Sequence, residues 1–336
     1  MVNHSSVNIE QVPTMSEAKP ILFVSSSLDE ATLDPVARKL TAKGHEVSMW
    51  YTDKMANGEA GFCAQIDCDG LQVAYNGEPV ALHDLGAAWF RRTALLMGEG
   101  DIAKQMAVDT ERRLLLSGIA LAIDDERWLN APARMERAGK KLAQLSLAAN
   151  LGFLIPQTVV TNCWDDIQDK LPDDIVYKAG QPLFASDNTL LALYTKEFKN
   201  NPKTLPLQQN PYPGIWQAYK SKAREWRITV VGDETFDAAI YTSFEAKDDW
   251  RKHQSHDSRV EFKHEAFPDE YKEKCFAYLA VTGLRYGAFD FIEDSTGEVT
   301  FLECNPNGQF MWLEAGLGLP ISDAIASKLS SIAKSN

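Results

Sequence analysis

The sequence lacks a paired set of cysteines, a long apolar run and a surplus of positive charge. Its five cysteines are odd in number and include no Cys-x-x-Cys pair, so a disulfide framework is a poor basis for the fold. No stretch approaches the roughly 18 apolar residues that a membrane helix requires, and the first residues lack a basic segment followed by an apolar one. We therefore expect a protein of the reducing cytoplasm with no membrane partner.

Positive charge is scarce, since 34 Lys and Arg oppose 47 Asp and Glu, and the formal net charge is -13. Nucleic acids are bound through a local surplus of Lys and Arg, so this balance argues against a nucleic-acid partner. Three common site motifs are also missing: the P-loop, the Gly-x-Gly-x-x-Gly turn of dinucleotide-binding folds and the Gly-x-Ser-x-Gly elbow of serine hydrolases. A zinc site at His253, His256 and His264 is only a weak alternative, because no Cys or Glu supports their spacing.

The length of 336 residues, 45% of them hydrophobic, is enough for two or three packed units of mixed α/β (α+β) type. Apolar runs at 21–27, 46–51 and 87–91 are typical of buried strands. A helix between the first two, opening at Asp34-Pro35 and ending at Gly44, predicts a parallel sheet. A stretch rich in Pro and Asn before residue 214 marks a boundary. We expect a flexible arm at 1–19, an N-terminal α/β unit at 20–128, a central unit at 129–214 and a C-terminal unit at 215–336.

Periodicity predicts the remaining elements. The expected helices lie at 102–123, 138–152, 268–283 and 321–332, the expected strands at 155–161 and 173–180, and the expected hairpins at 225–243 and 284–305, with a hairpin or flexible loop at 182–194.

Oxygen ligands for a divalent cation gather in the hairpin at 284–305. Glu303 and Asn305 are two residues apart on a strand, so both side chains point to one face, and Asp290 lies in the preceding strand. Carboxylate and amide oxygens suit Mg²⁺, which binds carboxylates together with nucleotide phosphates. The pattern also fits a solvated hairpin, but apolar flanks such as Phe289 make isolated carboxylates costly without a cation. The sequence therefore predicts a magnesium site at Asp290, Glu303 and Asn305.

Cationic side chains suited to phosphate lie on three other predicted elements. Lys141 opens a predicted helix, and Lys178 ends a predicted strand. Arg227 alternates with Glu225 on one face of a further strand. Each lysine alone is more often an ordinary surface residue, yet together with Arg227 they can surround a triphosphate. We take Arg227 and Lys178 as the catalytic candidates.

The order of short motifs along the chain resembles a known family of ligases. The motifs are WFRR (89–92), KKLAQ (140–144), LGFLIPQT (151–158), VYK (176–178), WQAYK (216–220), EWRITVVG (225–232), DWRK (249–252), GAFDFI (287–292) and LECNPNGQFMWLE (302–314). They resemble the ATP-grasp peptide maturases of the graspetide, or microviridin-type, group over nearly everything from Pro20 onward. WFRR, DWRK and NPNGQFMWLE are more particular to these maturases than the motifs that many ATP-grasp ligases share.

The resemblance implies an ATP-grasp fold of three subdomains, with ATP held between the central and C-terminal units. Matching positions place the residues beside ATP at Lys141, Lys178, Gln217, Ala218, Tyr219, Lys220, Glu225 and Arg227, and those that hold Mg²⁺ at Asp290, Glu303 and Asn305. The hinge beside adenine reads Gln217-Ala218, where members of the family commonly have Gln-Glu. Ala218 therefore supplies no side-chain carboxylate to the nucleotide.

The resemblance also implies a substrate. The family activates Asp or Glu side chains of a precursor peptide with ATP and joins them to Ser or Thr hydroxyls or to Lys amines, as macrolactones or macrolactams. A leader segment would bind near the central unit, and Asp249 and Arg251, with the segment at 182–194, are candidates for that contact. Arg91 and Arg92 of WFRR are further peptide-binding candidates. A homodimer is expected from the family.

Two other functions stay open at this point. A ligase that adds a free amino acid to a protein or small acid would share the ATP and metal residues, and only the WFRR and DWRK segments argue against it. A catalytically inactive ATP-grasp fold that merely binds a peptide is disfavoured, because the metal residues and both lysines are present.

Overall fold

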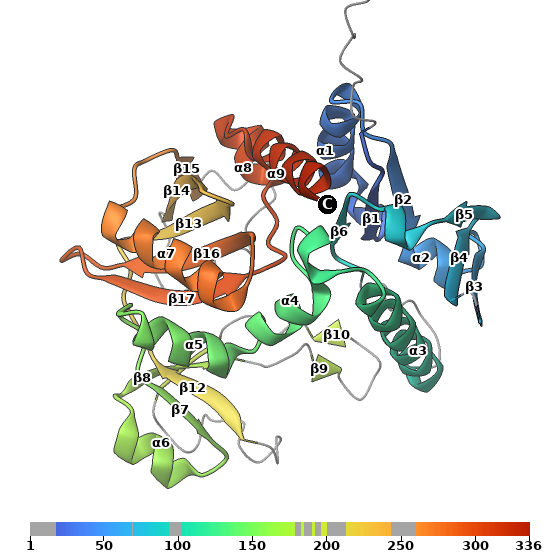
Figure 1. Cartoon of the computed structure of the whole chain (residues 1–336). Coiled ribbons are helices and arrows are strands. Elements are labelled where there is room, and N and C mark those ends of the chain that lie inside the picture. The colour runs from blue at the N-terminus through green and yellow to red at the C-terminus, as the bar shows by residue number, and fades with distance from the viewer. Residues whose placement is uncertain are drawn as a thin grey trace, which may run out of the picture.

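The computed structural model describes residues 18–68, 70–93, 102–178, 183–184, 190–191, 196–199, 213–242 and 260–336. These residues form a mixed α/β structure with several separate sheets, as expected. Figure 1 shows the chain passing from an N-terminal unit in blue, through a central unit in green, to a C-terminal unit in orange and red. Within these ranges, no helix has both the length and the apolar character needed to span a membrane.

A small parallel sheet is the centre of the N-terminal unit, with strand order β2-β1-β6. The predicted opening strands are confirmed as β1 (Ile21–Ser25), β2 (Val47–Tyr51) and β6 (Ala87–Phe90), and the helices are α1 (Glu30–Ala42), α2 (Thr52–Ala56) and α3 (Ile102–Leu121). A second, antiparallel sheet of β3 (Phe62–Asp67), β4 (Gly70–Tyr75) and β5 (Glu78–Val80) was not predicted. Most of β3 is exposed, so its sequence shows no apolar face.

Helix α1 begins earlier than the sequence predicted. The expected start was Asp34-Pro35, but α1 begins at Glu30 and contains Pro35. Ser26 caps the 3-10 turn η1 (Ser27–Asp29) directly before the helix, since its side chain accepts a hydrogen bond from the Leu28 amide at 3.3 Å. This upstream cap supplies the start signal, so the prediction from Asp-Pro was wrong.

The central unit contains a four-stranded antiparallel sheet with strand order β11-β8-β12-β7. Its strands are β7 (Thr158–Thr161), β8 (Asp174–Lys178), β11 (Lys196–Lys199) and β12 (Gly214–Ala218), and its helices are α4 (Pro132–Ala138), α5 (Lys141–Asn150) and α6 (Trp164–Lys170). Within the expected hairpin at 182–194, the described strands β9 (Leu183–Phe184) and β10 (Leu190–Leu191) pair in antiparallel fashion.

A five-stranded antiparallel sheet forms the C-terminal unit, in the order β15-β14-β13-β16-β17. Its strands are β13 (Arg224–Val231), β14 (Glu234–Thr242), β15 (Val260–Lys263), β16 (Tyr286–Glu293) and β17 (Val299–Asn305), and its helices are α7 (Asp269–Thr282), α8 (Met311–Leu317) and α9 (Ile321–Ser335). Both predicted hairpins are confirmed, with Gly232 and Gly297 in the left-handed conformation at their turns.

Two apolar clusters position the elements around the candidate site. One packs Phe289, Phe291 and Phe301 of the five-stranded sheet against α4, α5 and α7. The other joins the parallel sheet to α1 and α9, so the last helix of the chain lies beside the first (Figure 1). Aromatic residues take one face of β16 and β17, and the other face receives Asp290 by alternation along β16 and Glu303 through the bulge at Leu302 on β17.

Candidate active site

A buried ion pair marks the polar face of the five-stranded sheet. Arg227 on β13 lies opposite Asp290 on β16, and its Nε and Nη2 donate to the two carboxylate oxygens at 2.6 and 3.2 Å. Each of the two residues is 6% exposed. Glu303 on β17 lies opposite Asp290, next to a β-bulge that follows Asp290. Arg227, Asp290 and Glu303 therefore form one row across three adjacent strands.

Strand alternation explains why this row faces away from the aromatic cluster. Phe289 and Cys304, the chain neighbours of Asp290 and Glu303, are fully buried in that cluster, so the two carboxylates point to the opposite face. Burial raises the pKa of the Cys304 thiol well above its usual range, and the nearby Cys275 adds to the shift. The thiol between the two predicted metal residues of β17 therefore stays protonated and is no nucleophile.

Asn305 lies on the same face as Glu303, at the end of β17. It pairs with Ala288 on β16, and its side-chain oxygen accepts a hydrogen bond from the Asn307 amide at 2.9 Å. Asp290, Glu303 and Asn305 together offer two carboxylates and an amide oxygen, the hard oxygen donors that Mg²⁺ binds. Over the described ranges, no three His, Cys, Asp or Glu side chains come close enough to hold a metal ion. A cation site here thus depends on the amide oxygen and on the ligand's own phosphates.

Lys141 approaches this row from the first turn of α5. Its Nζ lies 3.6 Å from Glu303 Oε2, and the two side chains are 34% and 31% exposed. Partly exposed ion pairs at this distance contribute little to stability, so Lys141 can exchange Glu303 for a stronger anion.

A small cavity collects four of the predicted ATP and metal residues. Its lining consists of Lys141 and Leu145 of α5, Lys178 of β8, Ile215 and Gln217 of β12, and Leu302 and Glu303 of β17. The cavity therefore lies between the four-stranded and the five-stranded sheet. The two candidate phosphate lysines, which are distant in sequence, meet there beside a candidate metal ligand.

Gln217 has an unused acceptor at this cavity. The residue is 1% exposed, and its Nε2 donates to Thr158 Oγ1 at 2.8 Å. Among the residues that the structure describes, its Oε1 has no hydrogen-bond partner. A buried polar atom without a partner costs about 1–3 kcal/mol, so a ligand that donates a hydrogen bond there gains affinity. The amino group of an adenine base is such a donor.

The backbone of the predicted hinge is already hydrogen-bonded within the chain. The Ala218 amide donates to the Gln157 carbonyl, and the Tyr219 amide donates to the Asp174 carbonyl, each at 2.9 Å. These two amides are therefore occupied in this conformation, whereas the Gln217 side-chain oxygen can still accept a hydrogen bond from a ligand.

Lys220 and Glu225 each take part in an ion pair. Lys220 Nζ lies 3.1 Å from Glu298 at the surface. Glu225 pairs with Lys222 at 2.6 Å, and these two side chains are only 13% and 11% exposed. The sequence reading missed Lys222, because a lysine in an irregular segment carries no local signal of burial.

Arg91 is buried and engaged within the chain. It is 1% exposed, forms an ion pair with Asp29, and donates to the Gly308 carbonyl at 3.1 Å and to the Gln309 side chain at 3.0 Å. Burial lowers the pKa of its guanidinium, and Asp29 opposes that shift. The Gln309 carbonyl in turn accepts from Arg227 Nη1 at 3.3 Å. Arg91 thus holds the loop that positions Arg227, and contact with a peptide would require this loop to open.

Arg92 is exposed, two residues after the end of β6, and its φ of 45° lies in the left-handed region that is uncommon outside glycine. It stays a candidate for peptide contact. Asp249, Arg251 and most of the segment at 182–194 lie outside the described residues, so the predicted leader contacts stay predictions.

Gln144 ties α5 to the strand of the metal residues, and the sequence reading did not assign it a role. Its Nε2 donates to the Ala138 and Cys304 carbonyls, each at 2.7 Å, and its Oε1 accepts from the Cys304 amide at 3.2 Å. Because Cys304 lies between Glu303 and Asn305, Gln144 fixes the backbone that carries both. A polar residue among the apolar positions of the helix was the one local signal.

Solved structures supply the comparison with known proteins. The chain is similar to the macrocyclase MdnB of Microcystis aeruginosa, with 30% identity, a TM-score of 0.74, and coverage of 93% of this chain and 99% of that one. The macrocyclase MdnC of the same organism, bound with precursor peptide MdnA, is 25% identical with a TM-score of 0.78, at 93% and 99% coverage. A RiPP-associated ATP-grasp ligase of Chryseobacterium gregarium, in complex with ADP and a leader and core peptide, is 26% identical with a TM-score of 0.80, at 93% and 97% coverage. No family model and no curated protein matches the sequence. The fold and these likenesses show that the chain belongs to the ATP-grasp ligase family of the two macrocyclases.

Proposed function

We propose that this protein is an ATP-dependent ligase that activates Asp or Glu side chains of a precursor peptide as acyl phosphates. It then joins them to Ser or Thr hydroxyls or to Lys amines of the same peptide. The observation that supports this most is the cavity where Lys141, Lys178 and Glu303 meet, beside the buried ion pair of β13 and β16. The likeness to two macrocyclases supports the choice of a peptide substrate.

The cations of the site would hold the charge of ATP. Lys141 and Lys178 would bind phosphate oxygens, and Lys141 would give up its weak contact with Glu303 to do so. Arg227 would meet the transferred phosphoryl group. Because Asp290 fixes this guanidinium with two hydrogen bonds before the reaction, it can stabilise developing charge without reorganising.

The oxygen donors of β16 and β17 fit a hard divalent cation. Asp290, Glu303 and Asn305 would hold Mg²⁺, and the ion would neutralise part of the phosphate charge during transfer. Asp290 would then share its oxygens between the metal and Arg227, which keeps the guanidinium next to the phosphates. Gln217 Oε1 would accept a hydrogen bond from the adenine amino group.

The proposed reaction has two steps. A carboxylate oxygen of the peptide attacks the γ-phosphorus of ATP, and ADP leaves with the electrons of the broken P–O bond. A hydroxyl or amine of the same peptide then attacks the acyl carbon, phosphate leaves, and the attacking group loses its proton to solvent. Because both groups belong to one chain, the second step gains from an effective molarity of about 10⁵ M or more.

Hydroxylamine trapping tests this proposal. The purified protein, given ATP, Mg²⁺ and a precursor peptide, should release ADP, and hydroxylamine should convert the acyl phosphate into a hydroxamate on the peptide. Glu303→Gln should lose both signals. Glu273→Gln is the matched control, because Glu273 is an exposed glutamate on α7, which packs against the other face of the sheet. Unchanged ADP release by Glu303→Gln would overturn the site.

The remaining expectations concern partners. A homodimer is predicted from the family resemblance, and analytical ultracentrifugation of the purified protein would test it. The leader contact at Asp249 and Arg251 is tested by the peptide affinity of Asp249→Asn and Arg251→Gln.

A further inference from the structure

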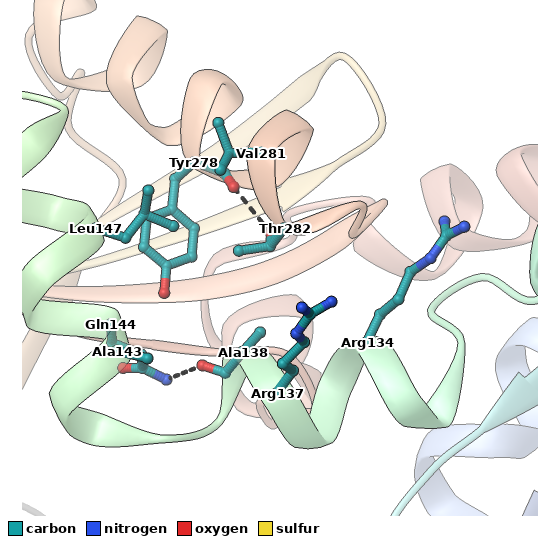
Figure 2. A pocket seen from close by; sticks show the side chains of 9 residues that line it. All are labelled: Arg134, Arg137, Ala138, Ala143, Gln144, Leu147, Tyr278, Val281 and Thr282. Carbon is teal, nitrogen blue, oxygen red and sulfur yellow. Dashed lines mark hydrogen bonds between the residues drawn. The ribbon is translucent and has the colours of Figure 1, made fainter.

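A second pocket lies on the opposite side of α5 from the cavity at Lys141. Figure 2 shows it between α4, α5 and α7, with Arg137 reaching up from α4 and Tyr278 pointing down from α7. Its volume of about 290 Å³ is close to the lower end of the about 300–1,000 Å³ that is usual for small-molecule sites. It is therefore large enough for a small ligand and is separate from the proposed ATP site.

Most polar groups around this pocket already have partners. Arg134 forms ion pairs with Asp125 at 3.1 Å and Glu126 at 2.9 Å. The Gln144 amide is fully used by the backbone contacts described above, and the Thr282 hydroxyl donates to a carbonyl of α7 at 2.8 Å. These three side chains are held in place by their partners, so they contribute little hydrogen bonding to a ligand.

Two hydrogen-bond donors of the pocket have no acceptor. The Tyr278 residue is 0% exposed, and within the described part of the chain its buried hydroxyl has no hydrogen-bond partner. Burial raises the pKa of Tyr278 well above its usual range, so the hydroxyl keeps its proton and can only gain by donating it. The guanidinium of exposed Arg137 likewise forms no ion pair with any described residue. A ligand with an acceptor group could therefore bind the Tyr278 hydroxyl and the Arg137 guanidinium together.

The charge around the pocket has the sign that an anion requires. None of the described residues that line it is acidic, whereas the whole chain has 47 Asp and Glu against 34 Lys and Arg. The other walls are apolar and include Ala138, Leu147 and Val281, of which Val281 is 64% exposed. A ligand that fits these walls has one anionic group and an apolar body.

We propose that this pocket binds a small carboxylate with a short apolar body. The carboxylate accepts hydrogen bonds from Arg137 at the mouth and from the Tyr278 hydroxyl at the inner end, while the apolar body covers Leu147 and Val281. The hydroxyl is buried, so the wall of the pocket must open for the ligand to reach it. The new hydrogen bond offsets the free-energy cost of that movement, because the Tyr278 hydroxyl has no partner before the ligand binds. This inference does not rest on the proposed ligase function.

Binding of phenylacetate to the full-length protein, measured by isothermal titration calorimetry without nucleotide, tests the site. Arg137→Gln should weaken binding by at least about tenfold, since it removes a charge-assisted hydrogen bond. Arg38→Gln is the matched control, because Arg38 is an exposed arginine on α1, far from this pocket in the fold, and should leave binding unchanged. Phenylacetamide, which has no charge, should bind much more weakly than phenylacetate.

Tyr278→Phe separates ligand contact from folding. It removes only the unpartnered hydroxyl, so the melting temperature should not fall, while phenylacetate affinity should drop several-fold. Lys141→Ala should leave the affinity unchanged, because Lys141 lines the other cavity. The proposal is overturned if phenylacetate shows no saturable binding, if Arg137→Gln and Tyr278→Phe bind it as the native protein does, or if Lys141→Ala abolishes binding.

Discussion

Replacing Asp290 with Asn measures the structural cost of the buried ion pair. Asn keeps the shape of the side chain but leaves the guanidinium of Arg227, a residue 6% exposed, without its counter-charge. Removing one partner of a buried pair usually costs about 3–5 kcal/mol. The Gln309 carbonyl still accepts from Arg227 Nη1 at 3.3 Å, so we expect a loss near the lower end, about 3 kcal/mol in the free energy of unfolding.

The double variant Arg227→Met with Asp290→Leu separates stability from activity. It removes both charges and keeps a similar volume, and such replacements of buried pairs are often neutral or stabilising. We therefore expect it to recover most of the free energy of unfolding lost by Asp290→Asn. It should stay inactive, because the proposed phosphoryl contact and one metal ligand are both missing.

Urea unfolding followed by circular dichroism gives the free energy of unfolding of the native protein and both variants, and ADP release gives their activity. A double variant as unstable as the single one would show that the cost does not come from an unpaired charge. A double variant that releases ADP at the native rate would contradict the assignment of Arg227 and Asp290 to the site.

Three further predictions concern the same sheet and its neighbours. Lys141→Ala should raise the KM for ATP in initial-rate ADP assays, whereas Lys140→Ala, an exposed neighbour paired outside the cavity, should not. Gln309→Ala should lower kcat by about tenfold to a hundredfold with little change in the KM for ATP, because it loosens the loop that positions the Arg227 guanidinium. Equal effects on kcat and on the KM would argue against a positioning role. Burial alone would raise the pKa of Glu293, but hydrogen bonds from Arg224 and a neighbouring indole lower it overall. The stability that Glu293 contributes is therefore present at neutral pH and is lost as the pH falls through this lowered pKa. Glu293→Gln should flatten the acid side of the curve of unfolding free energy against pH, and an unchanged curve would refute this reasoning.

Local patterns were sufficient to predict the polar row of the site. Alternating apolar and polar residues, with a Gly turn in each hairpin, placed Arg227, Asp290 and Glu303 on strands, and the structure pairs them side by side. The signal is local, because strand periodicity and turn residues are both set within a few positions.

Contacts between distant segments could not be predicted in the same way. Arg91 and Asp29 are 62 positions apart, and Gln144 lies 160 positions from Cys304. No periodicity links such residues, so the burial of Arg91 and the anchoring role of Gln144 emerge only when the units pack. The early start of α1 has a different cause, since a serine cap outweighed a more conspicuous Asp-Pro signal.

The intact mass of a precursor peptide after reaction with the purified protein, ATP and Mg²⁺ tests the central claim most directly. A peptide encoded beside the gene of this protein is the natural substrate to use. We predict the loss of one water per linkage, dependent on ATP and absent with Glu303→Gln. A peptide that instead gains the mass of a supplied amino acid, or keeps its mass while ATP is consumed, would contradict the account.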